Sequence, residues 1–321
     1  MLKKNTIQKS IKHLLRTIEL SGFGDKHQGK VRDIYLFGDY RILITTDRIS
    51  AFDRVLGYIP YKGQVLNQLS QFWFEKTKDI VANHLVSVPH PNVAVAKNAR
   101  PYPVEMVVRG YISGVTKTSI WKAYESGERV IYGIKFPHGL SKNQKLERPV
   151  ITPTTKAEHG AHDERLTREE IISRKLVKPD IYHKMEKAAL ALFARGSDIC
   201  KRKGLILVDT KYEFADYNGQ LMLIDEIHTP DSSRFWKADT YRERFAKGLE
   251  PENFDKEFLR LWYAKKNYRG DGEPPNMSKE LQIATSERYI KIYEMITGRK
   301  FIAGKYPLVK EIALSIKKYF S

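Results

Sequence analysis

A run of acidic residues between positions 205 and 236 offers the clearest chemistry in this sequence. Its carboxylates are Asp209, Glu213, Asp216, Asp225, Glu226 and Asp231. The chain as a whole has a net charge of +18, so this acidic crowding is local. Like charges on one short segment repel each other unless a cation lies among them. Because Mg²⁺ prefers a few carboxylate oxygens together with phosphate oxygens, the segment predicts a magnesium site that works on a phosphorylated compound.

Two apolar strands, 205–214 and 221–227, are expected to carry these acids as a hairpin with a turn at 217–219. The alternation of side chains puts Asp209, Lys211 and Glu213 on one face of the first strand. A two-residue Asn-Gly loop would place Asp225 on the face opposite Glu213, whereas a three-residue loop with a left-handed Gly219 would place both on one face. We expect the three-residue loop, because it makes a metal site. The alternative is an exposed hairpin whose charges face water.

Two basic segments precede the hairpin. Lys30 and Arg32 follow a glycine-rich stretch at 22–29 and are two residues apart on an expected strand, so both would point to one face. Backbone amides in such a stretch can approach phosphates closely, although solvent-facing basic pairs are common and no Walker-type sequence is present. Arg109 ends an apolar strand and precedes Gly110. It predicts either an anion site or a structural salt bridge.

A polar, turn-rich stretch at 152–163 contains Lys156, His159, His162 and Asp163. Binding loops often have this composition. The two histidines are three residues apart, as in a helical zinc pair, but a proline and a glycine interrupt the stretch. Because no third ligand stands at a standard spacing, we expect no zinc site.

The elements that must position these residues change in kind along the chain. The expected elements are a helix at 5–20, a hairpin of 30–36 and 41–46, a helix at 67–77, a strand at 104–108, the acidic hairpin, and helices after about 250. Strands early and helices late, without βαβ alternation, predict an α+β fold with antiparallel sheets. We expect a mostly antiparallel N-terminal lobe of residues 1–107 and a larger C-terminal lobe of residues 108–321.

Composition narrows the function further. The 321 residues can bury the cores of two lobes, and no apolar run reaches the length of a membrane span. The single cysteine, Cys200, fits a core position in a reducing, cytoplasmic protein. The basic charge is compatible with nucleic-acid binding, with an enzyme of anionic substrates, or with a solvated surface.

Taken together, these segments resemble the phosphoribosylaminoimidazole-succinocarboxamide synthase (SAICAR synthetase) family. The most specific part is Asp-Thr-Lys-Tyr-Glu-Phe at 209–214 with Asp-Ser-Ser-Arg-Phe-Trp at 231–236; further matches lie at 29–35, 46–53, 103–109 and 154–162. The resemblance implies a two-lobed fold related to ATP-grasp enzymes and kinases, in which the lobe of residues 1–107 covers the nucleotide and the lobe of residues 108–321 binds substrate and metal. It also implies an ATP- and Mg²⁺-dependent ligase of purine biosynthesis that joins L-aspartate to carboxyaminoimidazole ribonucleotide (CAIR) through an acyl phosphate.

The resemblance also implies roles for single residues. The nucleotide would lie against Val104–Met106 and be bound by Gly29, Lys30, Arg32, Glu105, Met106, Lys156, Glu213 and Asp225. Glu213 and Asp225 would hold Mg²⁺. Substrate binding would fall to Arg109, Ser113, Ser119, Asp231, Ser232, Ser233 and Arg234, and catalysis to Lys156, Lys211 and Arg234. The family serine after Gly114 has no exact counterpart, which leaves Ser113, Thr116 and Ser119 as candidates.

Two other functions fit parts of the sequence. An inositol-type small-molecule kinase would use the same Mg-ATP residues but would need a base near the accepting hydroxyl. A nucleic-acid-binding protein would show basic and aromatic residues interleaved on one face, whereas here Lys and Arg are spread over the chain. We therefore expect small-molecule partners and neither nucleic acid nor membrane. Monomer and homo-oligomer both remain open.

Overall fold

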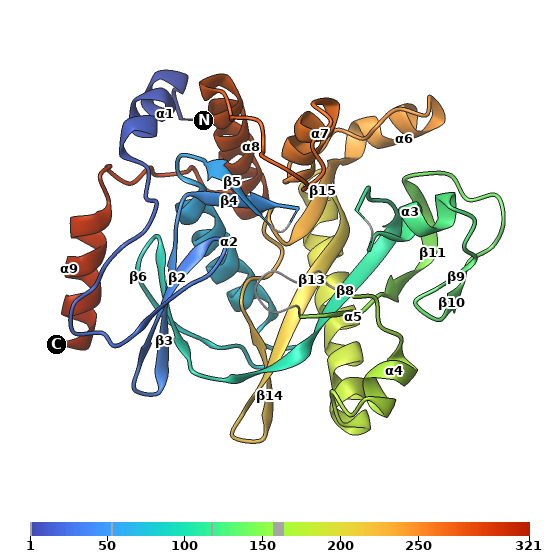
Figure 1. The fold of residues 1–321 in the computed structure, drawn as a ribbon, viewed down its shortest axis with the longest axis horizontal. Coiled ribbons are helices and arrows are strands. Elements are labelled where there is room, and N and C mark those ends of the chain that lie inside the picture. Colours follow the sequence, from blue (N-terminus) through green and yellow to red (C-terminus); the bar gives the residue numbers. More distant parts are fainter. Residues whose placement is uncertain (1, 53, 117, 157–163) are drawn as a thin grey trace.

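The computed structural model describes residues 2–52, 54–116, 118–156 and 164–321, and Figure 1 shows their arrangement. The helices are α1 (Lys4–Ser10), η1 (Ile11–His13, a 3₁₀ turn), α2 (Lys62–Thr77), α3 (Ile120–Glu125), α4 (Arg168–Ser173), α5 (Pro179–Arg202), α6 (Ala238–Ala246), α7 (Glu257–Lys265), α8 (Lys279–Thr297) and α9 (Val309–Phe320). The strands are β1 (Lys26–Gln28), β2 (Arg32–Phe37), β3 (Tyr40–Thr45), β4 (Arg48–Ala51), β5 (Arg54–Tyr58), β6 (Leu85–His90), β7 (Val93–Lys97), β8 (Arg100–Ile112), β9 (Val130–Ile131), β10 (Ile134–Lys135), β11 (Gln144–Ile151), β12 (Thr154–Thr155), β13 (Leu205–Tyr217), β14 (Gln220–Ile224) and β15 (Ser233–Lys237). The predicted α+β class is confirmed.

The first sheet is antiparallel, in the order β1-β2-β3-β7-β6. The predicted hairpin with its turn at Gly38 and Asp39 is present as β2 and β3. The strand begins at Arg32, however, and Lys30 lies exposed in the bend before it. The expectation that Lys30 and Arg32 share a strand face is therefore wrong, because the bend ends the two-residue alternation.

The second sheet carries the acidic hairpin, in the order β11-β8-β13-β14, with β12 paired to β8 and β15 paired to β13. Its strands are antiparallel too. The expected boundary at 107/108 falls inside β8, which continues unbroken from Arg100 to Ile112. The two-lobe division stays a prediction, but no linker lies at that position.

The turn of the acidic hairpin corrects a prediction. Tyr217 pairs with Gln220 and Glu213 pairs with Ile224, so the loop has two residues, not three. Asn218 and Gly219 have φ values of 54° and 79°, the conformation of a type I′ turn, whose twist matches that of the two strands. Asp225 is thus in the register that opposes Tyr212. The strand ends before it, and its φ of 67° turns the chain away from the regular alternation.

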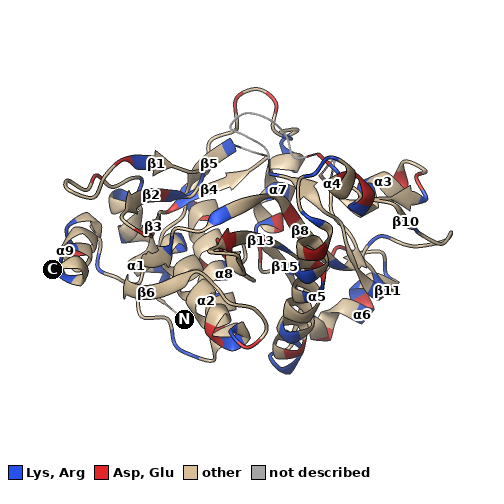
Figure 2. Cartoon of the chain, turned by 90° about the horizontal axis from the view of Figure 1, so that it is seen from below, with Lys and Arg blue, Asp and Glu red and all other residues tan. Residues whose placement is uncertain are grey.

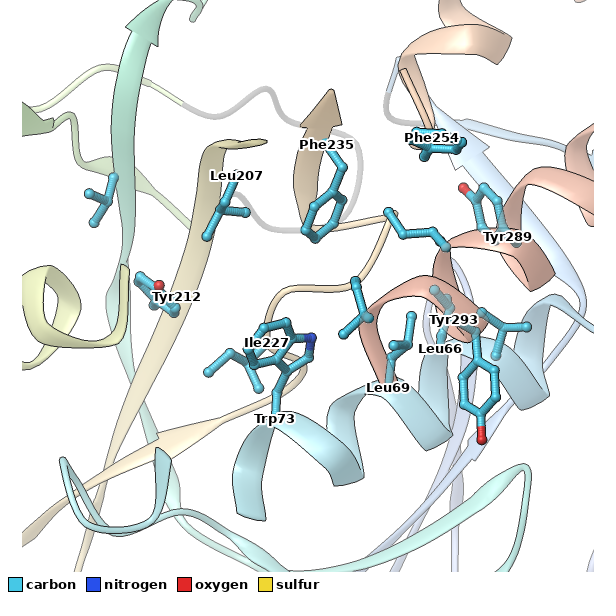
Figure 3. Packing of buried hydrophobic residues seen from close by; sticks show 14 of the residues in the cluster. Leu66, Leu69, Trp73, Leu207, Tyr212, Ile227, Phe235, Phe254, Tyr289 and Tyr293 are labelled. Carbon is cyan, nitrogen blue, oxygen red and sulfur yellow. The ribbon is translucent and has the colours of Figure 1, made fainter. Parts of the chain in front are cut away.

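One large core joins the early and late parts of the chain. Figure 3 shows Leu66, Leu69 and Trp73 of α2 facing side chains of β13, β15 and α8. Their partners include Leu207, Phe235, Tyr289 and Tyr293. The helices predicted after residue 250 are present as α7, α8 and α9, and α8 packs on α2. Sequence-distant elements therefore share one apolar interior.

A second core lies between the first sheet and the last helix. Ile42 and Ile44 of β3 pack with Ile312 and Ile316 of α9, and α9 stands beside β2, β3 and β6 in Figure 1. The predicted helix at 5–20 is shorter than expected: it ends with η1, and the following residues run as an extended segment whose apolar side chains join this core. Chain ends thus cover the sheet that carries Arg32.

The longest helix, α5, packs on β13 and β8. Cys200 on this helix is fully buried, and burial raises the pKa of its thiol, so the predicted core role is confirmed. Across the described ranges, none of the helices combines the length and the apolar character needed to cross a membrane.

Candidate active site

Two neighbouring strands place the predicted site residues. In the ladder between β8 and β13, Arg109 pairs with Asp209 and Glu105 pairs with Glu213, with no register shift between these two pairs. Side chains at cross-strand positions lie on the same face of a sheet. Since residues four apart on a strand also share a face, the two pairs form two neighbouring groups of charge on one surface.

The first group, here called the carboxylate cluster, consists of Glu105, Glu213, Asp225 and Glu226 with Arg32, Lys156 and Lys211. Lys211 Nζ lies 2.8 Å from Glu105 Oε1 and also contacts Glu213. Lys156 Nζ lies 2.6 Å from Glu213 Oε2.

Arg32 joins the carboxylate cluster from the first sheet. Its guanidinium donates to Glu226 Oε2 at 2.7 Å and contacts Asp225. The site therefore draws on both sheets and brings together Arg32 and Asp225, which are far apart in the sequence.

Charge governs the proton affinities in this cluster. Burial alone would lower the pKa of Lys211, yet the nearby Glu213 and Glu105 raise it well above its ordinary value. Burial alone would raise the pKa of Glu213, but Lys211 and Lys156 hold it far below its usual range. Arg32 shows the same balance: despite burial, Asp225 and Glu226 raise its pKa. These groups are therefore charged at neutral pH.

Glu213 and Asp225 carry carboxylate oxygens of the kind that Mg²⁺ prefers. Glu213 contacts Lys211 and Lys156, and Asp225 contacts Arg32. The φ of 67° at Asp225 ends the regular alternation, so the position of its side chain does not follow from the strand register. Among the described residues no group of three or more acidic, histidine or cysteine side chains has metal-binding geometry. Two carboxylates completed by phosphate oxygens remain a suitable donor set for Mg²⁺.

The second group, here called the arginine cluster, consists of Arg109, Arg234, Asp209 and Glu257. Arg109 donates to Asp209 Oδ2 at 3.2 Å and to Thr152 Oγ1 at 2.8 Å. Arg234 contacts the same oxygen of Asp209, and its Nε lies 3.5 Å from Glu257 Oε2. Both arginines are buried, and two cations converging on one carboxylate can bind an anion such as a phosphate. The salt bridge considered for Arg109 is also present.

The loop after β8 closes on this cluster. A Cβ added to Gly114 would lie 2.6 Å from Ser119 Cβ and 3.1 Å from Arg234 Nη2, so only glycine lets the loop approach the guanidinium this closely. Ser119 caps α3 and donates to Thr116 O at 2.7 Å, while Ser113 donates to Asn143 Oδ1 at 2.7 Å. Ser119 and Arg234 therefore both lie beside Gly114.

Asp231 is engaged within the protein. Its Oδ1 accepts from Tyr289 OH at 2.7 Å, and its Oδ2 lies 2.9 Å from Lys62 Nζ and 3.8 Å from Lys256 Nζ. Burial alone would raise the pKa of Asp231, but Lys256 and Lys62 lower it to about 2. Burial lowers the pKa of Lys256 to about 8. These contacts fix the loop that leads into Arg234.

The two serines that follow are also engaged internally. Ser232 Oγ accepts from Thr229 N at 3.2 Å, and Ser233 donates to Thr210 Oγ1 at 2.7 Å. The side chains of residues 231–233 are thus already hydrogen-bonded within the protein, so a substrate would have to share or replace these bonds. Arg234, in contrast, lies beside Gly114.

The predicted nucleotide contacts lie in two places. Gly29 donates its N–H to Arg32 O at 2.8 Å, so the bend that contains Lys30 is closed directly before β2. Val104–Met106 lies in the middle of β8, and Met106 is fully buried in the main core. β13 and β12 pair with this segment on its two sides, and the expectation that the nucleotide lies against it stays a prediction.

Several charged neighbours of the site were not predicted from the sequence as site residues. Glu226 stands next to a predicted ligand, and Asp209 alternates with Lys211 and Glu213, so the acidic run contained their signal. Lys62, Lys256 and Glu257 come from segments without a recognisable pattern. His159, His162 and Asp163 lie outside the described residues.

Known proteins resemble this chain over most of its length. A sequence profile of the family described as SAICAR synthetase matches residues 25–275. The chain belongs to the SAICAR synthetase family. A phosphoribosylaminoimidazole-succinocarboxamide synthase of Legionella pneumophila is 53% identical over 288 residues, which cover 89% of this chain and 91% of that protein. The chloroplastic synthase of Arabidopsis thaliana is 50% identical over 290 residues, covering 90% and 70%.

Solved structures agree with the family. The SAICAR synthase of Saccharomyces cerevisiae complexed with SAICAR superposes with a TM-score of 0.76 at 32% identity, over 89% of this chain and 99% of that chain. A SAICAR synthetase in complex with ADP has a TM-score of 0.66 at 26% identity, over 87% and 100%. The predicted fold and the predicted ATP-dependent ligase of purine biosynthesis are confirmed. Neither the kinase nor the nucleic-acid alternative gains support, and basic residues occur on elements across the molecule from α9 to α6 (Figure 2).

Proposed function

We propose that this SAICAR synthetase family member binds Mg-ATP at the carboxylate cluster and the ribonucleotide CAIR at the arginine cluster. The observation that carries this assignment is the ladder in which Glu105–Glu213 and Arg109–Asp209 are neighbouring cross-strand pairs. Lys30, Arg32 and Lys156 supply positive charge for the phosphates, and Arg109 and Arg234 supply it for the phosphate of the ribonucleotide. Glu213 and Asp225 would hold Mg²⁺, which neutralises charge on the transferred phosphoryl group.

The reaction needs an activated carboxylate. An oxygen of the CAIR carboxylate attacks the γ-phosphorus of ATP, the bond to the β–γ bridging oxygen breaks, and ADP leaves. Lys156 and Lys211 both contact Glu213, so they stand where charge accumulates during the transfer. The amine of L-aspartate then attacks the acyl carbon, loses a proton and displaces inorganic phosphate. The product is the amide SAICAR.

Positioning, more than covalent catalysis, is the task of the residues in this site. The arginine cluster would fix one end of the ribonucleotide while the carboxylate cluster holds the phosphoryl donor. All three substrates are anions, which fits the positive surroundings. A cytoplasmic location fits these substrates and the buried, reduced Cys200.

Product formation with omission of single components tests this proposal. Purified protein is mixed with ATP, Mg²⁺, CAIR and L-aspartate, each is left out in turn, and ADP release and the absorbance of the succinocarboxamide are followed. We expect turnover only with all four. ATP hydrolysis that is independent of aspartate, without the amide product, would overturn the assignment.

A further inference from the structure

Arg48 hydrogen-bonds to the backbone segment that leads to Arg32. Its buried guanidinium donates to the carbonyl oxygens of Arg16 at 2.6 Å, Gly29 at 3.1 Å and Lys30 at 3.3 Å. It also donates to Asp33 Oδ1 at 2.7 Å. A guanidinium that satisfies three carbonyl groups and a carboxylate at once fixes their relative positions. The bend around Lys30 therefore depends on Arg48.

Asp33 extends this attachment to the N-terminal segment. Its Oδ2 accepts from Thr17 Oγ1 at 2.8 Å and from Ile18 N at 2.9 Å. Burial alone would raise the pKa of Asp33, yet these hydrogen bonds and Arg48 lower it. The carboxylate is therefore charged at neutral pH and binds residues 17–18 to the start of β2.

Asp47 connects the same place to the C-terminal part of the chain. Its Oδ2 accepts from Leu15 N at 2.8 Å and from Tyr306 OH at 2.7 Å, and its Oδ1 accepts from Gly63 N at 3.3 Å. Tyr306 OH in turn accepts from Tyr61 N at 2.8 Å. Asp47 is fully buried, so each of these bonds replaces water that the carboxylate has lost.

Tyr306 belongs to a connection, residues 298–308, that hydrogen-bonds to α2. Gln64 on α2 donates to Ile302 O at 2.6 Å and accepts from Gly304 N at 2.9 Å. In Figure 1 this connection runs from α8 past the N-terminal segment to α9. It lies beyond residues 25–275, the part of the chain that matches the family profile. The contact to Asp47 is therefore made by a segment that lies beyond the profile match.

We propose that Tyr306 is a positioning residue for nucleotide binding: through its hydrogen bond to Asp47 it holds Asp47 and Arg48 in place, and Arg48 holds the backbone of residues 29–32 over the phosphates. This inference rests on the proposed function, because it takes residues 29–32 to cover ATP. Tyr306 itself touches Asp47 and Tyr61, and its effect reaches the nucleotide through two further residues.

Removal of the hydroxyl tests the proposal. Tyr306→Phe keeps the ring and loses both hydrogen bonds. We expect the KM for ATP and the calorimetric Kd for ADP to rise about 5- to 10-fold, while kcat and the KM values for CAIR and aspartate stay within about twofold. Tyr319→Phe is the matched control, because Tyr319 is exposed on α9 and contacts only a neighbouring ring among the described contacts. It should change none of these constants.

A second variant acts at the opposite end of the same contacts. Thr17→Val removes one hydrogen bond to Asp33 from an exposed position, and we expect the KM for ATP to rise about 2- to 3-fold. An unchanged KM for ATP and Kd for ADP in Tyr306→Phe would overturn the proposal, whatever the result for Thr17→Val. Equal losses for all three substrates together with kcat would also overturn it, since they indicate general damage. A wild-type protein that makes no SAICAR would instead disprove the proposed function.

Discussion

The carboxylate cluster and the arginine cluster lie on the same two strands but differ in construction. The arginine cluster comes from the second sheet and the helix α7 that follows it, and its two arginine side chains are only 7% and 10% exposed. The carboxylate cluster also needs Arg32 from the first sheet, and Lys156 in it is 43% exposed. We infer that the arginine cluster is preformed. The carboxylate cluster depends on how the two sheets are placed and on the ligands that join it.

The largest expected effect distinguishes the clusters by their role in phosphoryl transfer. Glu213→Gln removes the charge that Lys156 and Lys211 share. We expect kcat to fall about 10³-fold, with a higher Mg²⁺ concentration needed for half-maximal rate. Steady-state kinetics across a magnesium titration measures both. Glu147→Gln, at an exposed position, is the control, and a kcat close to wild type for Glu213→Gln would remove this glutamate from the reaction.

The next effect concerns the arginine cluster. Arg234→Lys keeps a positive charge but loses the forked geometry that reaches Asp209 and Glu257 together. We expect the KM for CAIR to rise about 100-fold while the KM for ATP stays near wild type. The exposed Arg242→Lys serves as the control. If the KM for ATP rose equally, the two clusters would not be separate binding sites.

A smaller effect concerns the stability of the loop that leads to Arg234. The pKa of Asp231 is about 2 in the folded protein and 3.8 ordinarily, so its stabilising contribution is complete above about pH 4 and is lost as the pH falls through 2. We expect the difference in unfolding free energy between wild type and Asp231→Asn to shrink by about 2 kcal/mol from pH 6 to pH 2. Urea denaturation at both pH values measures it.

The control for this measurement is Asp239→Asn, which changes an aspartate that is 68% exposed. Its difference from wild type should remain constant over the same range. A constant difference for Asp231→Asn as well would mean that Lys62 and Lys256 do not stabilise the folded protein through this carboxylate.

The smallest effect tests how closely the arginine cluster is packed. Gly114→Ala puts a Cβ against Ser119 and Arg234, at a φ of 101°. We expect the KM for CAIR to rise about 5- to 10-fold. Gly127→Ala is a matched control, because Gly127 has the same φ and nothing within 4 Å of the added Cβ. Equal kinetic effects of the two substitutions would attribute the result to backbone strain and not to the contact with Arg234.

Local patterns predicted much of this fold. The β2–β3 hairpin, the acidic hairpin, α2 and the late helices follow from apolar periodicity and turn residues. The register of the acidic hairpin was also readable, since an Asn-Gly pair favours a two-residue turn. The expectation of a longer loop rests only on the metal site that such a loop would make. Asp225 contacts Arg32 from a left-handed residue directly after the end of the strand, and no alternation pattern predicts that conformation.

Other parts of the site could not be predicted from local patterns. Lys62, Lys256 and Tyr289 meet at Asp231 from α2, the start of α7 and α8, and their approach depends on how helices pack. The same holds for Tyr306, which lies 259 positions from Asp47. Such contacts depend on tertiary structure, whereas the shared face of Lys211 and Glu213 can be predicted from alternation along one strand.

The unshifted ladder from Arg109–Asp209 to Glu105–Glu213 also acts as a molecular ruler. Four residues of antiparallel strand measure roughly 13 Å, and this length is set by backbone geometry, which side-chain substitutions leave unchanged. A ligand pair that bridges both clusters must match that span. Inserting a single residue between Glu105 and Arg109 would turn one of the two side chains to the opposite face unless a β-bulge absorbed the extra residue.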